Sequence, residues 1–278
     1  MNRIVTMAAV IAALSTPAMA ELKIGGDFEW NYQNNDGATT TDVDADLNFK
    51  PSMTLDDGTK VSADININED GDDDGGNSMT IAKGIWSIDM GDTSSATDAI
   101  DDKTDWGKVL TNGSPSTDHA ALLTIKPIDG LKVMTSFAAD SNYGTTAGSG
   151  YAYSAAYTMG PITVGAGKLE NDAGSSETVS NISGGVGDIA LAYEKHTATT
   201  AAGVDTDTTT MAAKYTIGNT KLLVELMEAE SANVVSSDET TFGVHQTIAP
   251  GLVAFVETTD DEKTASEQTT AIGLTMAF

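Results

Sequence analysis

The sequence predicts an all-β fold, a closed antiparallel transmembrane β-barrel of about sixteen strands with short turns at one rim and longer loops at the other. One observation is the alternation in the last segment, whose apolar face comprises Ile272, Leu274, Met276 and Phe278 and whose other face is small or polar. Because successive side chains of a strand point to opposite faces, this alternation is typical of a wall between lipid and water. The alternation also recurs along the chain, and turn residues recur at regular intervals.

Residues 1–20 have the pattern of a secretory signal peptide. The basic Arg3 precedes an apolar run, residues 4–14, and the segment closes at Ala20 on a small-x-small cleavage site. The apolar run is shorter than the roughly 20 residues that a membrane-spanning helix needs. We therefore expect an exported chain whose mature part, residues 21–278, forms one barrel domain.

Composition excludes several classes of protein. The chain has no cysteine, which excludes a disulfide-stabilised secreted scaffold. Its 41 acidic residues against 14 basic ones, a net charge of −27, argue against a nucleic-acid partner, which requires clustered Lys and Arg. Disorder is the alternative for so acidic a chain, but disordered chains do not alternate with a fixed period.

The strands near the N-terminus show the alternation clearly. In the first strand the face without charges comprises Leu22, Ile24, Phe28, Trp30 and Tyr32. The opposite faces of the first two strands, with one residue of a later strand, supply the candidate lumen residues Lys23, Asp27, Glu29, Asp44, Asp46, Lys50 and Lys132. A β-sandwich has the same period, so alternation alone leaves a dry core and a lipid-facing wall both open.

The spacing of the turns separates these two possibilities. We expect short turns at residues 56–58, 83–84, 127–130, 160–161, 185–188, 218–219 and 250–251. Between them lie longer polar segments, at residues 34–41, 69–77, 91–118, 140–150, 170–176, 197–207, 230–238 and 260–267. This arrangement indicates an up-and-down membrane barrel with both termini at the short-turn rim. A barrel of about sixteen strands is wide enough to enclose an aqueous channel.

Several short motifs add a family resemblance. They are residues 21–28, 84–92, 127–131 and 157–164 and the terminal Phe278. In this order they resemble the Gram-negative general diffusion porins, of the compact Rhodobacter-like type found in α-proteobacteria. The resemblance implies a homotrimer in the bacterial outer membrane, surrounded by lipid and lipopolysaccharide, through which small hydrophilic solutes and ions diffuse. It also implies that the outer-membrane assembly machinery reads Phe278, and that the third long loop folds inward to narrow the pore.

The third loop corresponds to residues 91–118, the longest loop in the chain. Its charged candidates for the constriction are Asp92, Asp98, Asp101, Asp102, Asp105, Lys103 and Lys108. Acidic rings favour cations, so we expect a cation-selective pore, with a solvated acidic surface loop as the alternative. The basic wall that the family sets opposite this loop has no clear counterpart, because the inward lysine candidates, which also include Lys126 and Lys214, are scattered and no arginine cluster accompanies them.

The second loop, residues 69–77, resembles the start of a calcium-binding loop through Asp70, Asp72 and Asp74. The closing position holds Ile81 instead of a bidentate glutamate, so the segment is not an EF-hand and no cofactor is expected. Weak calcium binding, a contact with the neighbouring subunit and a solvated loop are the open alternatives.

Aromatic residues and histidines bear on function. The aromatic residues expected to face lipid, in thin girdles at the membrane interfaces, are Trp30, Tyr32, Tyr153, Tyr157, Tyr193, Tyr215 and Phe278. The histidines, His119, His196 and His245, are far apart and lie in no nucleophile or zinc motif, so no enzyme activity is expected. We therefore expect a passive pore; the alternatives are a solute-specific channel and an exported acidic structural or surface protein.

Overall fold

The computed structural model describes residues 20–35, 37–67, 77–101, 103–104, 118–138, 150–172, 174–232, 234–263 and 267–278. Outside the described residues lie the signal-peptide prediction for residues 1–19 and the predicted site residues Asp70, Asp72, Asp74, Asp102, Asp105 and Lys108. Within the described residues, no helix is long and apolar enough to cross a membrane.

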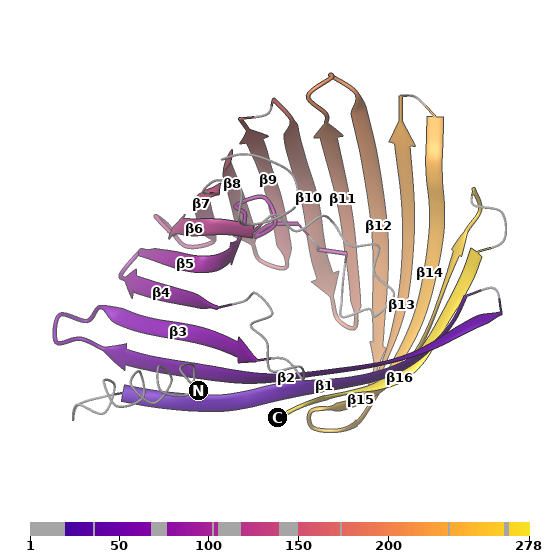
Figure 1. The fold of residues 1–278 in the computed structure, drawn as a ribbon, viewed down its shortest axis with the longest axis horizontal. Helices are drawn as coiled ribbons and strands as arrows, with labels where there is room; N and C mark the ends of the chain where they lie inside the picture. Colours follow the sequence, from indigo (N-terminus) through magenta and orange to yellow (C-terminus); the bar gives the residue numbers. More distant parts are fainter. Residues whose placement is uncertain are drawn as a thin grey trace.

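The described residues form sixteen strands that close into one antiparallel barrel (Figure 1). In chain order the strands are β1 (Ala20–Asn35), β2 (Ala38–Thr54), β3 (Lys60–Ile67), β4 (Ser78–Lys83), β5 (Trp86–Ser94), β6 (Asp118–Ile125), β7 (Leu131–Ala138), β8 (Gly150–Met159), β9 (Ile162–Asn171), β10 (Ser176–Val186), β11 (Ile189–Thr199), β12 (Asp205–Ile217), β13 (Thr220–Ser231), β14 (Val234–Ala249), β15 (Leu252–Asp261) and β16 (Glu267–Ala277). Each strand pairs with its neighbours in the chain, and β1 pairs with β16. Closure leaves no open sheet edge, as a lipid environment requires, and the predicted fold class is confirmed.

The connections at the two rims agree with the sequence prediction to different degrees. At the short-turn rim the strands are joined, as expected, by residues 55–59, 84–85, 126–130, 160–161, 187–188, 218–219 and 250–251. At the other rim the connection between β5 and β6 is the longest, also as expected, but several predicted long loops are shorter, since strands are joined by residues 36–37, 172–175, 200–204 and 232–233. Threonine-rich strand ends such as residues 38–41 continue the ladder nearly to the turn.

The outer face of the barrel is apolar. Ile24, Leu191 and Phe242 are 59%, 58% and 53% exposed, and similar side chains surround the wall. An apolar surface of this extent suits lipid rather than water. The aromatic residues that we expect to face lipid are all exposed: Trp30, Tyr32, Tyr153, Tyr157, Tyr193, Tyr215 and Phe278.

The barrel seam places the C-terminal residue on β1. The backbone N–H of Phe278 donates to the carbonyl of Gly26 at 3.0 Å, and the N–H of Gly26 donates back to the carbonyl of Phe278 at 3.1 Å. A Cβ atom on Gly26 would lie 2.4 Å from the carbonyl oxygen of Asp46 and 2.8 Å from Cζ of the Phe278 ring. Only glycine lets the Asp46 carbonyl and the Phe278 ring approach β1 this closely, so Gly26 and Phe278 together define the seam.

Candidate functional site: the lumen and its inward loop

The inner face of β1 and β2 brings together the wall residues that the sequence predicts. Three pairs of like charge stand directly opposite each other there: Lys23 with Lys50, Asp27 with Asp46, and Glu29 with Asp44. Opposed like charges destabilise a pair of strands, so folding alone does not favour this arrangement. Departures of this kind from local consistency are expected where a surface has a function.

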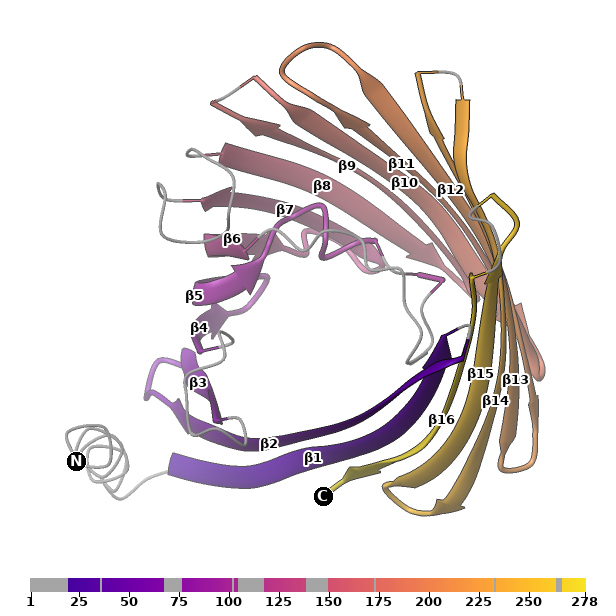
Figure 2. The same ribbon diagram turned by 45° about the vertical axis from the view of Figure 1, so that its right-hand side comes forward.

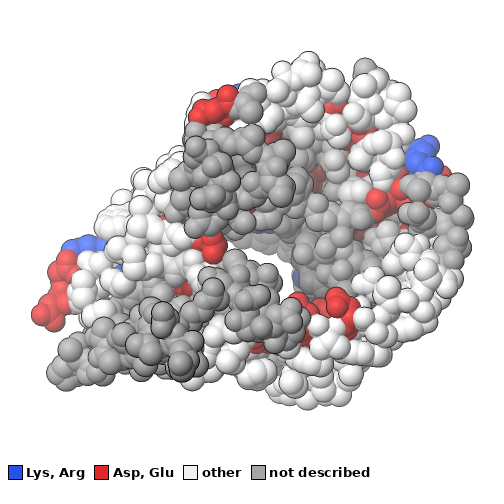
Figure 3. Space-filling model, in the orientation of Figure 1, with Lys and Arg blue, Asp and Glu red and all other residues white. Residues whose placement is uncertain are grey.

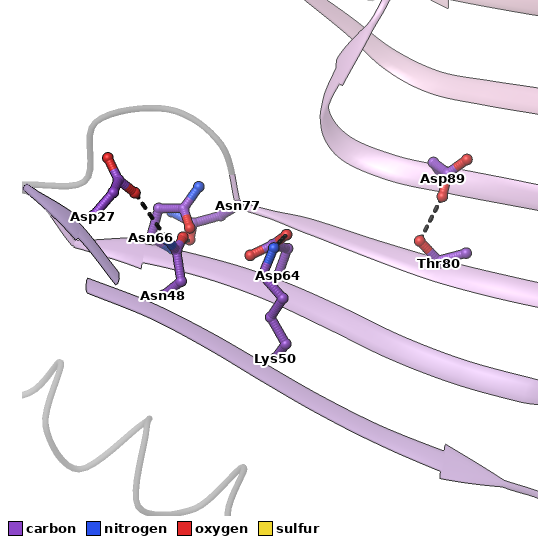
Figure 4. Close-up of polar contacts among 8 residues, drawn as sticks. All are labelled: Asp27, Asn48, Lys50, Asp64, Asn66, Asn77, Thr80 and Asp89. Carbon is purple, nitrogen blue, oxygen red and sulfur yellow. Dashed lines mark hydrogen bonds and ion pairs between the residues drawn. The ribbon is translucent and has the colours of Figure 1, made fainter. Parts of the chain in front are cut away.

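The polar strip continues across the next three strands (Figure 4). Lys50 of β2 reaches toward β3, where its Nζ lies 2.8 Å from Oδ2 of Asp64. Thr80 of β4 donates to Oδ1 of Asp89 of β5 at 2.5 Å. Five neighbouring strands thus present charged and hydroxyl groups to one shared space, which the space-filling view shows as a hollow at the centre of the molecule with acidic side chains around it (Figure 3).

The segment after β5 turns into the barrel and lies along its inner wall (Figure 2). It begins with a single helix-like turn, in which the N–H of Ala99 donates to the carbonyl of Ser95 at 3.0 Å. Ser95 and Ala96 have no exposed surface, and Ile100 is 1% exposed. Burial this complete in a hollow barrel means that the segment is packed against the wall rather than suspended in water.

Small side chains on β7, β8 and β9 make room for the segment. The N–H of Ala96 donates to Oγ of Ser136 at 2.7 Å, and Oγ of Ser154 donates to the carbonyl of Ala96. A Cβ atom on Gly167 would lie 2.8 Å from Cβ of Ser154 and 3.1 Å from Cγ2 of Thr97. The loop therefore occupies the volume that larger inward side chains would fill.

Further along the loop, polar side chains of β10 and β11 bind its backbone. Nδ2 of Asn181 donates to the carbonyl of Ile100. The N–H of Lys103 donates to Oε2 of Glu194 at 3.4 Å, and Nζ of Lys103 donates to the carbonyl of Asp101 at 2.9 Å. These contacts tie the described part of the loop to the wall as far as β11.

An apolar cluster inside the lumen holds the same segment. Ala96 and Ile100 of the loop pack with inward-facing wall residues that are almost fully buried: Leu122, Met134, Ala152, Leu169 and Val179. Sequence reasoning missed this cluster, because the inner face of a wide barrel is expected to be polar. The sequence of β7 could have indicated this cluster, because the adjacent Val133 and Met134 make both faces of that strand apolar.

The acidic residues expected at the constriction do not form one ring in the described part of the loop. Asp92 belongs to β5. Oδ2 of Asp98 accepts a hydrogen bond from the N–H of Ser95 at 3.2 Å, which closes the helix-like turn. Asp101 is 2% exposed, so its carboxylate does not meet the lumen water, contrary to the expectation for an eyelet residue. Lys132 of β7 lies close enough to Lys103 for their charges to interact.

Two histidine–glutamate pairs on the inner wall were also missed. Nε2 of His196 lies 2.8 Å from Oε1 of Glu177, and Nε2 of His245 lies 2.6 Å from Oε1 of Glu257, which has no exposed surface. Each pair joins adjacent strands, so only the strand register brings the partners together. In the described part of the chain, no group of three or more His, Asp or Glu side chains is arranged to hold a metal ion.

Comparisons with known proteins find one family model and several solved structures that are similar to this chain. The family model described as Gram-negative porin matches residues 7–275. The Vibrio cholerae outer membrane protein OmpT, lacking its loop L8, has a TM-score of 0.77 at 15% identity over 94% of this chain and 100% of its own. Salmonella typhi OmpF, in complex with daunomycin, has a TM-score of 0.78 at 14% identity over 92% and 97%.

A third similar structure is a mutant of the Rh. blastica porin, with a TM-score of 0.72 at 15% identity over 93% of this chain and 100% of its own. No curated protein sequence matches the chain. At these identities the structural similarities establish the shared fold.

Proposed function

Because the chain belongs to the Gram-negative porin family, we propose that it is a passive diffusion pore of the outer membrane for small hydrophilic solutes and ions, with a preference for cations. The observation that supports a pore most strongly is the described part of the loop, residues 95–101 and 103–104, docked on the inside of a closed barrel with an apolar outer face. A loop held against the wall narrows an aqueous path through the barrel. Diffusion through such a path needs no cofactor and no catalytic group.

Cation preference is supported by the wall rather than by the described part of the loop. The opposed pairs Asp27–Asp46 and Glu29–Asp44 concentrate negative charge on β1 and β2, across the lumen from β7 and β8, against which the loop lies (Figure 2). Rings and patches of carboxylates lower the free energy of a cation in a pore and raise that of an anion. With no arginine in residues 21–278, only lysines oppose this field.

The remaining parts of the proposal follow from the family. They are removal of residues 1–20 on export, recognition of Phe278 by the assembly machinery, a homotrimer in lipid and lipopolysaccharide, and a Rhodobacter-like subtype. The Phe278 ring contacts Gly26 and is still 69% exposed in the closed barrel. Such a ring is accessible to a binding partner before β16 pairs with β1, which supports a role as a recognition signal. An exported surface protein without a pore is disfavoured by the apolar outer wall.

Liposome swelling tests the pore. Vesicles containing the refolded protein, diluted into isotonic solutions of uncharged sugars of increasing size, are expected to swell quickly with the smallest sugar and progressively more slowly with larger ones. Heat-unfolded protein in the same vesicles is the control. Folded protein that admits none of the sugars would contradict the proposal, and entry of one sugar regardless of size would favour a solute-specific channel.

A further inference from the structure

The lysines of the lumen wall are confined to one part of its height. Those on described strands and their turns all lie at the short-turn rim or within four residues of the strand end there: Lys23, Lys50, Lys60, Lys126, Lys132, Lys214 and Lys221. A residue in a strand tilted by about 45° rises roughly 2.3 Å along the barrel axis, so these lysines form a belt roughly 10 Å high. We call this set the basic belt.

Members of the basic belt lie close to one another. Lys23 and Lys50 are directly opposed across the β1–β2 pair. Lys132 lies near enough to Lys126 for their charges to interact, and Lys214 is similarly placed relative to Lys221. Like charges repel, so this clustering leaves a positive field at the short-turn mouth of the lumen.

Acidic residues on the strands of the same belt weaken this field. Nζ of Lys23 lies 3.7 Å from Glu21 and that of Lys50 lies 2.8 Å from Asp64, and Asp89 faces the lumen at the same height. The side chains of Lys23 and Lys50 are 71% and 54% exposed, and exposed pairs of this kind are weakly coupled. On the strands of the belt, the six inward lysines outnumber these three acids; the turns of the same rim add Lys126 together with Asp56, Asp57, Asp129 and Asp188.

Beyond the basic belt, toward the other rim, the described inner wall is acidic. Its inward carboxylates on the strands there include Asp27, Glu29, Asp42, Asp44, Asp46, Glu177, Glu194, Glu225, Glu239, Glu257 and Asp261. The described inner wall of these strands has no lysine at this height; His196 lies 2.8 Å from Glu177 there, and His245 lies 2.6 Å from Glu257. On β1 and β2 the charge of the inner wall changes from positive to negative within four residues, from the pair Lys23–Lys50 to the pair Asp27–Asp46.

We infer that this separation of charge along the barrel axis makes the pore conduct asymmetrically, with larger current when the long-loop side is positive. The inference rests on the proposed function. With that polarity, cations enter through the acidic zone and anions through the basic belt, so both accumulate where the zones meet. The opposite polarity draws both kinds of ion away from that junction and lowers the conductance.

Salt sets the size of the effect. The Debye length is about 30 Å at 0.01 M and about 3 Å at 1 M ionic strength. At 10 mM salt the charges of the two zones act across the lumen, and we expect the currents at opposite voltages to differ about twofold or more. At 1 M salt only ions next to the wall feel these charges, so the ratio is expected to approach one.

The test is the current–voltage relation of single channels of known orientation. The chain has no cysteine, so Ala201→Cys in the connection between β11 and β12 gives a single thiol. A thiol reagent too large to pass through the pore, added to one chamber, then identifies the long-loop side. The variant Lys23→Gln/Lys50→Gln removes two charges from the basic belt. Its matched control, Lys83→Gln/Lys168→Gln, removes two from the outward face.

At 10 mM salt we expect the stated asymmetry in the parent and in the control variant, and a ratio nearer to one in the belt variant, which keeps five of the seven lysines of the belt. Equal currents at both polarities in the parent, or an unchanged ratio in the belt variant, would overturn the inference while leaving the pore intact. Heat-modifiable migration in gels verifies that each variant is folded. Folded parent protein that forms no channel would overturn the proposed function as well, so the two failures are distinguishable.

Discussion

Truncation of Ile100 tests how the inward loop is held. Ile100 is 1% exposed and packs with Met134 and Val179 on the wall. The Ile100→Ala substitution removes buried methyl and methylene groups, which typically costs about 2–5 kcal/mol. Each of the backbone hydrogen bonds that also hold the loop contributes only about 0.5–1.5 kcal/mol, so Ile100 is the largest single anchor. Because the barrel ladder does not include Ile100, we expect the loss to fall on loop docking rather than on the barrel.

A loss of about 3 kcal/mol lowers the ratio of docked to undocked loop by roughly two orders of magnitude. Single-channel recording is expected to show more frequent transitions between conductance levels and a higher mean conductance in Ile100→Ala. The matched control is Ile182→Ala, which removes the same groups from a side chain on the outer face that is 46% exposed. Recordings of Ile100→Ala that match the parent in level and noise would refute the anchoring role.

The other predictions concern the seam, a buried pair and a turn. Gly26→Val places its Cβ 2.4 Å from the carbonyl oxygen of Asp46, so we expect a fall in the yield of heat-modifiable barrel, with Ala45→Val as the control; equal yields would contradict the seam geometry. His245→Leu removes the hydrogen bond between Nε2 of His245 and Oε1 of the buried Glu257, which costs about 1–3 kcal/mol and lowers the temperature of unfolding in gels, whereas His245→Leu/Glu257→Leu is expected to recover it. Lys83, whose Nζ donates to Oδ2 of Asp57 at 2.6 Å in the β2–β3 turn, holds the pKa of that carboxyl well below its usual value. The ion pair therefore stabilises the fold at a pH above the usual carboxyl pKa, and this contribution is lost as the pH falls through the lowered pKa. Lys83→Gln is expected to raise the pKa of Asp57, which the NMR shift of its carboxyl carbon reports. At neutral pH the substitution is expected to change stability no more than the loss of any exposed ion pair does.

The strands and short turns were accessible from sequence because their determinants are local. Alternation places Phe28 outward and Asp27 inward regardless of what lies elsewhere in the chain. The turn at Gly218 requires a φ of +58°, which glycine adopts readily, and the following Asn219 favours a turn. Lipid contact imposes a pattern on the middle of each strand, so membrane-spanning positions are easy to recognise.

The same logic explains why strand ends at the long-loop rim were misplaced. Beyond the lipid both faces of a strand meet water, so no alternation distinguishes residues 38–41 from a polar loop. Their threonines favour strands, but propensity is a weaker guide than alternation. The structure therefore extends β1 and β2 into what sequence reasoning assigned to a loop.

The docking of the inward loop depends on contacts between distant residues. Ala96 meets Ser136, and Ile100 meets Asn181, across separations of 40 and 81 residues. Such contacts follow from strand register and barrel curvature, which a single sequence does not specify. Burial of Asp101 shows the consequence, because an acidic loop residue can serve the loop's own packing rather than the pore.

The most direct test of a cation-preferring diffusion pore is the reversal potential of the purified mature protein in a planar bilayer under a salt gradient. We expect stepwise openings in multiples of three, as separate pores of one trimer, and a reversal potential displaced toward that of the cation. A displacement toward the anion would contradict the role of the carboxylates on β1 and β2. The absence of any channel, from protein shown to be folded, would contradict the pore itself.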